Sequence, residues 1–88
     1  SKVIIDVRTE SEWVGGHLQG ASHIPLGEIK NKIKFFEPNQ DAEIMLYCRS
    51  GNRSGKAKTI LEDMGYTNVK NIGGISSASN TFQIKIIK

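Results

Sequence analysis

The sequence predicts an α/β fold in which a small, mostly parallel sheet is flanked by short helices. Nearly continuous apolar runs at 3–7 and 44–47 have the pattern of strands that are buried on both faces. After these runs, apolar residues recur at spacings of three and four, which is typical of short amphipathic helices. Strands that alternate with helices favour right-handed crossovers and a site at the carboxyl ends of the strands.

The first strand is followed by a predicted short helix over 11–14. Thr9 and Glu12 fit a capping box, and the glycine pair 15–16 is expected to stop the helix. Trp13 is expected to anchor this helix in the core.

The middle of the chain predicts a turn, a strand and a second helix. Residues 17–20 are interpreted as the turn and 21–24 as a short strand that ends at Pro25. Apolar residues at three- and four-residue spacing predict an amphipathic helix of about ten residues within 26–36. The polar stretch 38–41 breaks it.

The end of the chain is less regular. Residues 69–72 are predicted to form a short strand, and the glycine pair 73–74 is expected to turn the chain. Residues 76–80 are small and polar, and are interpreted as a loop or a weak helix. Residues 81–88 alternate in part and predict a late edge strand, with one side formed by Phe82, Ile84 and Ile86.

Length and composition indicate one ordinary globular domain. The 88 residues leave no room for a second domain, so we expect a single domain over 1–88, acting as a monomer. A net charge of +3 is too small to argue for nucleic acid, and no apolar stretch is long enough to cross a bilayer. The chain starts at Ser1 without a methionine, which leaves two compartments open: periplasmic if a signal peptide has been removed, and otherwise cytoplasmic.

The loop after the second apolar run contains the only cysteine of the chain. Cys48 follows the predicted strand directly, and the loop closes on Ser54, a residue type that favours the N-cap of a helix. A helix N-terminus has unpaired N–H groups and a positive dipole end, which favour anions. Such surroundings lower the pKa of a thiol from its usual value of about 8.5. Cys48 is therefore predicted to be a nucleophile.

Positive side chains gather around this loop. Arg49 and Arg53 lie within it, and Lys56 and Lys58 are expected in the first turn of the helix that ends near Gly65. Lysines at this end oppose the helix dipole, so stability alone does not favour them. They suit an anion site instead.

The chain contains, in this order, the motifs Asp6-Val7-Arg8, Glu12, Gly16-His17, Gly20-Ala21, Ile24-Pro25-Leu26, Tyr47-Cys48-Arg49-Ser50-Gly51-Asn52-Arg53-Ser54, Gly65-Tyr66 and Gly73-Gly74. Together they resemble a rhodanese homology domain over about residues 3 to 75. The small size and short tail are most similar to the single-domain phage-shock-protein-E type of thiosulfate sulfurtransferase. The residues after the glycine pair depart from the family pattern, since no tryptophan follows within 75–80.

The resemblance implies a rhodanese-like three-layer sandwich and transfer of a sulfane sulfur through a persulfide on Cys48. It implies a small anionic donor, such as thiosulfate or a polysulfide, and a thiol or cyanide as acceptor, with a thioredoxin-like protein as a further candidate partner. No metal or organic cofactor is needed. The residues expected to surround the substrate are Arg49, Ser50, Gly51, Asn52, Arg53 and Ser54.

Two other functions remain open. A cysteine phosphatase or arsenate reductase also places a thiolate before a helix, but its pattern has five residues between cysteine and arginine, whereas four separate Cys48 from Arg53. A non-catalytic binding or regulatory module of the same fold is the second alternative.

The remaining polar and aromatic residues predict structural roles. His17 and His23 are expected to hydrogen-bond locally, because no other ligand type clusters with them. Asp6 and Arg8 predict a structural pair or loop contacts at the end of the sheet, with direct contact to substrate as the alternative for Arg8. Ser50 and Ser54 are expected to support the loop and the helix rather than act as nucleophiles. The expected core aromatics are Trp13, Phe35 and Phe36.

Overall fold

A computed structural model describes residues 2–88 and has a four-stranded, fully parallel sheet at its centre, in the order β3-β1-β4-β5. Its strands are β1 (Lys2–Asp6), β3 (Ser22–His23), β4 (Glu43–Cys48) and β5 (Val69–Gly74). A second, antiparallel pair joins β2 (His17–Leu18) to β6 (Ile86–Ile87). The helices are α1 (Glu10–Val14), a 3₁₀ turn η1 (Leu26–Glu28), α2 (Ile29–Phe36), α3 (Asn52–Asp63) and α4 (Ile75–Phe82).

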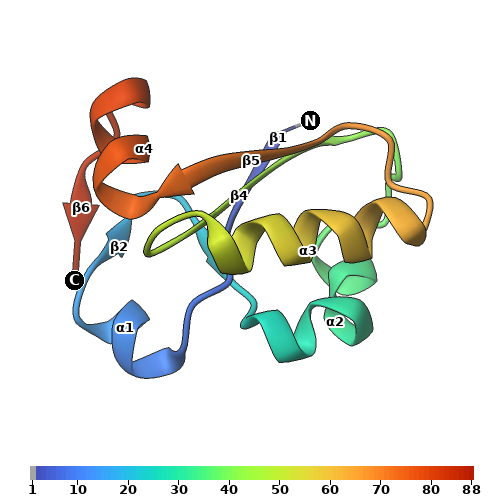
Figure 1. Cartoon of the computed structure of the whole chain (residues 1–88), viewed down its shortest axis with the longest axis horizontal. Coiled ribbons are helices and arrows are strands. Elements are labelled where there is room, and N and C mark those ends of the chain that lie inside the picture. Colours follow the sequence, from blue (N-terminus) through green and yellow to red (C-terminus); the bar gives the residue numbers. More distant parts are fainter. Residues whose placement is uncertain (1) are drawn as a thin grey trace.

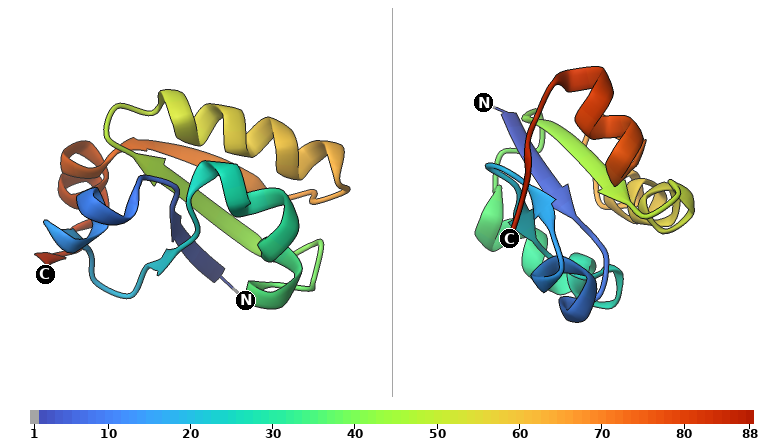
Figure 2. Two further views of the ribbon diagram at one scale, coloured as in Figure 1. Left: turned by 90° about the horizontal axis from the view of Figure 1, so that it is seen from below. Right: turned by 90° about the vertical axis from the view of Figure 1, so that its left-hand side faces the viewer.

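Layers cover both faces of this sheet, as the sequence predicts. Side chains alternate along a strand, so Ile44 and Leu46 of β4 face a core that α2 and α3 complete. Tyr47 of the same strand packs on the other face, with Leu18 of β2 and Ala78 of α4. Figures 1 and 2 show α1, β2, β6 and α4 together at one end of the molecule. The predicted three-layer α/β sandwich is confirmed.

The helix after the cysteine loop begins earlier than the sequence predicts. Gly51, with φ of 94°, precedes the first residue of α3, Asn52, and no side chain caps this helix. The prediction that Ser54 is the N-cap is wrong: Ser54 lies inside the first turn and is fully buried. For the same reason Lys56 and Lys58 lie beyond the first turn, and Lys58 approaches Glu62 at 3.8 Å.

The turns and strands predicted around β2 and β5 and at the end of the chain differ in part from the structure. The predicted turn at 17–20 contains β2, which pairs with β6, a segment about 70 residues away along the chain. Of the two alternatives predicted for 76–80, a loop or a weak helix, the helix is confirmed, since these residues are part of α4. The glycine pair 73–74 was expected to turn the chain, but β5 continues through it. The late strand is real but spans only Ile86–Ile87, because Phe82 still belongs to α4.

The three aromatic side chains predicted to lie in the core are not buried there. Phe35 is 86% exposed and Phe36 45% exposed, since α2 buries only Ile29 and Ile33. Trp13 is half-buried and stacks on two histidine rings, at centroid distances of 3.6 Å from His17 and 5.0 Å from His23. The capping box of α1 is confirmed, but the helix has no buried residue.

None of the helices within residues 2–88 combines the length and the apolar character that crossing a bilayer requires.

Candidate active site

Cys48 ends the central strand β4, and the loop after it bends around the sulfur atom. The Gly51 N–H donates to Cys48 Sγ at 3.0 Å, and the Ser54 hydroxyl oxygen lies 3.4 Å from the same sulfur. The side chain has no exposed surface. The structure therefore places the thiol as predicted, at the carboxyl end of a strand and beside the N-terminus of a helix.

These donors change the acidity of the thiol. Burial by itself raises the pKa of Cys48. Hydrogen bonds from the Ser54 hydroxyl and from the N–H groups of Ser54, Ser50 and Gly51 outweigh burial and lower the pKa to about 7. Near neutral pH about half of the sulfur is therefore thiolate, the form that acts as a nucleophile.

The loop approaches strand β5 so closely that only glycine fits there. A Cβ on Gly74 would lie 2.4 Å from the Arg49 carbonyl oxygen, and a Cβ on Gly51 would lie 3.3 Å from the Gly73 Cα. The register between β4 and β5 shifts at this point, where Cys48 faces Gly74. The glycine pair therefore shapes the site rather than a turn.

Asn71 of β5 braces the loop and was missed by the sequence analysis. Its Oδ1 accepts hydrogen bonds from the Ser54 hydroxyl at 2.7 Å and from the Gly73 N–H at 3.0 Å. Its Nδ2 donates to the Gly51 carbonyl oxygen at 2.9 Å. A polar side chain two positions ahead of the glycine pair was the one signal in the sequence.

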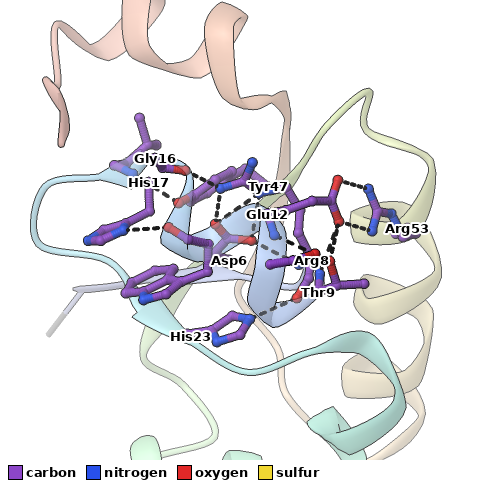
Figure 3. Close-up of polar contacts among 12 residues, drawn as sticks. Asp6, Arg8, Thr9, Glu12, Gly16, His17, His23, Tyr47 and Arg53 are labelled. Atoms are coloured by element: carbon purple, nitrogen blue, oxygen red, sulfur yellow. Dashed lines mark hydrogen bonds and ion pairs between the residues drawn. The ribbon is translucent and has the colours of Figure 1, made fainter. Parts of the chain in front are cut away.

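Arg53, predicted to hold the substrate, is bound to another residue. Its guanidinium donates to both carboxylate oxygens of Glu12, at 2.7 and 2.9 Å, and so joins α3 to α1. Figure 3 shows this fork, with the Thr9 end of the capping box on the same carboxylate. The Arg53 hydrogen bonds come first among the causes that lower the pKa of Glu12 from 4.5 to about 2. In this structure Arg53 acts as a clamp between two helices.

The predicted pairing of Asp6 with Arg8 is confirmed. The Arg8 guanidinium donates to Asp6 Oδ2 at 2.7 Å and to the Gly16 carbonyl oxygen at 2.6 Å, and both side chains are almost fully buried. The Tyr47 ring lies against the guanidinium, with 5.8 Å between the Arg8 Cζ and the ring centroid (Figure 3). This cluster fastens the segment after α1 to the sheet.

An open pocket of about 540 Å³ lies beside the loop. Arg49 lines it, and among residues 2–88 no carboxylate forms an ion pair with Arg49. Ser50 and Asn52, the other two predicted site residues, are exposed. The remaining lining mixes polar and apolar residues and consists of Arg8, Ser11, Glu12, Gly15, Gly16, Ile75, Ser76 and Ile86.

The two histidines take structural positions. His17 Nδ1 lies 3.0 Å from the Trp13 carbonyl oxygen, and His23 Nε2 lies 2.8 Å from that of Arg8. Within residues 2–88 no three His, Cys, Asp or Glu side chains are grouped so that they could hold a metal ion.

Fold and site together define a class: α/β proteins that hold an acidic cysteine in a ring of backbone N–H groups at the end of a parallel sheet. The chain belongs to the rhodanese-like domain family, whose sequence pattern matches residues 1–81. The family resemblance predicted from the sequence is thereby confirmed.

Individual relatives agree with this assignment. The thiosulfate sulfurtransferase PspE of Escherichia coli is 45% identical over 71 residues, which cover 81% of this chain and 68% of PspE. A putative mitochondrial thiosulfate sulfurtransferase of Schizosaccharomyces pombe is 34% identical, over 84% of this chain and 60% of that protein. The chain therefore spans roughly two thirds of the length of these relatives.

Two solved structures have nearly the same fold as this chain. A rhodanese with anions from Escherichia coli has a TM-score of 0.92 and 38% identity, over 100% of this chain and 99% of that one. A thiosulfate sulfurtransferase from Pseudomonas aeruginosa has a TM-score of 0.89 and 25% identity, over 99% of this chain but 17% of that one.

Proposed function

We propose that this protein is a sulfurtransferase that carries a sulfane sulfur on Cys48, from an anionic donor of the thiosulfate type to a thiol or cyanide. The observation that carries the proposal is the set of donors around Cys48 Sγ: the Gly51 N–H, the Ser54 hydroxyl and neighbouring N–H groups. They stabilise negative charge on the thiolate, and equally on a persulfide within the same loop.

The reaction follows from this arrangement in two steps. The Cys48 thiolate attacks the outer sulfur of thiosulfate, the S–S bond breaks, and sulfite leaves with the electron pair. The acceptor, as a thiolate or as cyanide, then attacks the outer sulfur of the persulfide, and Cys48 leaves as a thiolate. A covalent intermediate between two half-reactions gives ping-pong kinetics. A thioredoxin-like protein is a further candidate acceptor within this scheme.

Arg49 is the residue that we propose to attract the donor. It follows Cys48 directly, is exposed, lines the pocket and has no ion-pair partner among residues 2–88, whereas Arg53 is bound to Glu12. Cys48 itself has no exposed surface, so loading requires the loop to move enough to admit the donor.

Mass spectrometry of the intact protein tests the persulfide. Treatment with thiosulfate or polysulfide is expected to add one sulfur atom, and subsequent cyanide to remove it. The Cys48→Ser variant is expected to gain no sulfur and to unfold at a similar temperature. A gain that persists in this variant, or no gain in the parent with any donor, contradicts the proposal; the second result favours a binding module.

Steady-state kinetics test the role of Arg49. Loss of one charge-assisted contact is expected to raise KM for thiosulfate about tenfold in Arg49→Ala. Lys34→Ala is the matched control, because it removes one positive charge from the exposed side of α2. Equal KM values in the two variants would show that Arg49 contributes no more than net charge.

A further inference from the structure

Ser54 lies between two groups that compete for its hydroxyl proton. Its oxygen is 2.7 Å from Asn71 Oδ1 and 3.4 Å from Cys48 Sγ, and the residue is fully buried. A serine hydroxyl carries one proton. Ser54 can therefore donate to the amide oxygen or to the sulfur, but not to both at once.

The other contacts of Asn71 fix which of its atoms faces Ser54. Oδ1 also accepts from the Gly73 N–H, and Nδ2 donates to the Gly51 carbonyl oxygen. A flipped amide would place its NH₂ group against an N–H donor and its oxygen against a carbonyl, so both bonds would be lost. The atom that faces Ser54 is therefore an acceptor and cannot donate in return.

We propose that Asn71 is a positioning residue that, together with the charge on Cys48, decides where Ser54 directs its proton. When Sγ is uncharged, the hydroxyl donates to Asn71 and offers a lone pair to the sulfur side. When Sγ is a thiolate, the hydroxyl turns toward the sulfur, and Asn71 Oδ1 retains the Gly73 N–H.

This competition gives Asn71 a role in turnover that rests on the proposed function. In a persulfide the negative charge lies on the outer sulfur, so Sγ no longer needs the Ser54 proton and Asn71 receives it. Asn71 therefore stabilises the loaded protein relative to the free thiolate. Its removal is expected to favour the free thiolate.

Other hydrogen bonds also hold the loop around the sulfur. The effect of Asn71 on which atom receives the Ser54 proton can therefore be measured without loss of the loop structure. The Gly51 carbonyl oxygen also accepts from the Gly55 N–H at 3.1 Å, which holds the start of α3 without Asn71. The charged groups that surround Cys48 are left unchanged by substitutions at Ser54 and Asn71. They are Arg53 of α3, Glu12 of α1, Arg49 of the loop, and Asp6 at the end of β1 paired with Arg8 just beyond it.

The experiment measures the pKa of the Cys48 thiol from the pH dependence of its alkylation by iodoacetamide. Cys48 is the only cysteine, so the mass gain reports this site alone. Four proteins are compared: the parent, Ser54→Ala, Asn71→Ala and the double variant. Ser54→Ala is expected to raise the thiol pKa, because the thiolate loses a donor, by about half a unit to one unit.

Asn71→Ala is expected to lower the thiol pKa by a similar amount, because the competing acceptor is gone. In the double variant the pKa is expected to equal that of Ser54→Ala, since Asn71 acts through Ser54. A residue that only braces the loop would raise the pKa when removed, and would do so with or without Ser54. A raised thiol pKa in Asn71→Ala overturns the proposal, and so does an effect of Asn71→Ala that is the same with and without Ser54.

If Asn71→Ala fails to fold, Asn71→Asp replaces it as the variant in the alkylation test. Its carboxylate binds the Ser54 proton more strongly, so the thiol pKa is expected to rise, and to rise more with Ser54 present than in the Ser54→Ala background. Equal shifts in the two backgrounds contradict the inference. Alkylation requires no sulfur donor, so this test stands apart from the test of sulfur transfer.

Discussion

Breaking the clamp between Glu12 and Arg53 offers a sharp test of how the site is held together. Glu12→Gln removes the charge but keeps the size of the side chain. The lowering of the Glu12 pKa from 4.5 to about 2, caused first by Arg53 and then by the Thr9 hydrogen bonds, corresponds to about 3 kcal/mol of folding free energy before screening. Because 25% of the Glu12 and 32% of the Arg53 side chain is exposed, solvent screening reduces this to about 1–2 kcal/mol.

The unfolding free energy lost in Glu12→Gln is expected to be largest at neutral pH and to shrink as the pH falls. The pKa of Glu12 is lower in the folded protein than in the unfolded chain, so the clamp stabilises the fold fully above about pH 4.5. Its contribution falls as the pH drops from 4.5 toward 2 and vanishes below that. At pH 7 the variant is expected to melt about 4–8 °C lower for each kcal/mol lost.

Urea unfolding of the parent and of Glu12→Gln between pH 2 and pH 7 provides the measurement. Arg53→Ala is expected to show a similar loss at pH 7, and the double variant little more than either single variant. Equal unfolding free energies at pH 7, or a difference that remains unchanged at pH 2, would refute the reasoning. In that case Arg53 would be free to bind substrate, as the sequence alone suggests.

Three further predictions concern the site and the surface. The rate of persulfide formation in the parent is expected to rise with pH and to reach half its maximum near pH 7, where the Cys48 thiol titrates; stopped-flow loading at several pH values measures it. Gly74→Ala is expected to reduce stability by about 1–3 kcal/mol and to impair loading, because its Cβ would lie 2.4 Å from the Arg49 carbonyl oxygen, and urea unfolding with mass spectrometry checks both. Phe35→Gln is expected to change the unfolding free energy by less than about 0.5 kcal/mol, since the ring is 86% exposed, and a large loss would mean that the ring packs in solution.

The parts of the fold that depend on local pattern were predictable. The capping box at Thr9 and Glu12 needs only neighbours three residues apart, and it is present. The two central strands were recognisable because strands buried on both faces are apolar throughout. The position of Cys48 followed from the order of strand, loop and helix.

The parts that depend on contacts between distant residues were not predictable. The pairing of β2 with β6 joins Leu18 to Ile86, and two residues in each strand leave no alternating pattern to detect. Ser54 has the right side chain for an N-cap, but Gly51 adopts a positive φ that starts the helix earlier. Asn71 reaches the loop across 17 to 20 positions of sequence, so its role appears only in three dimensions.

The helix α1 forms one wall of the pocket although it buries no residue of its own. Two polar contacts connect it to the body, Glu12 to Arg53 and the Gly16 carbonyl oxygen just beyond it to Arg8, and Trp13 adds ring stacking on His23. At 1 M ionic strength charges are screened within about 3 Å, whereas apolar packing persists. Concentrated salt is therefore expected to weaken the part-exposed Glu12–Arg53 contact, while the buried Arg8 contact, the stacking of Trp13 and the backbone donors of the thiol persist.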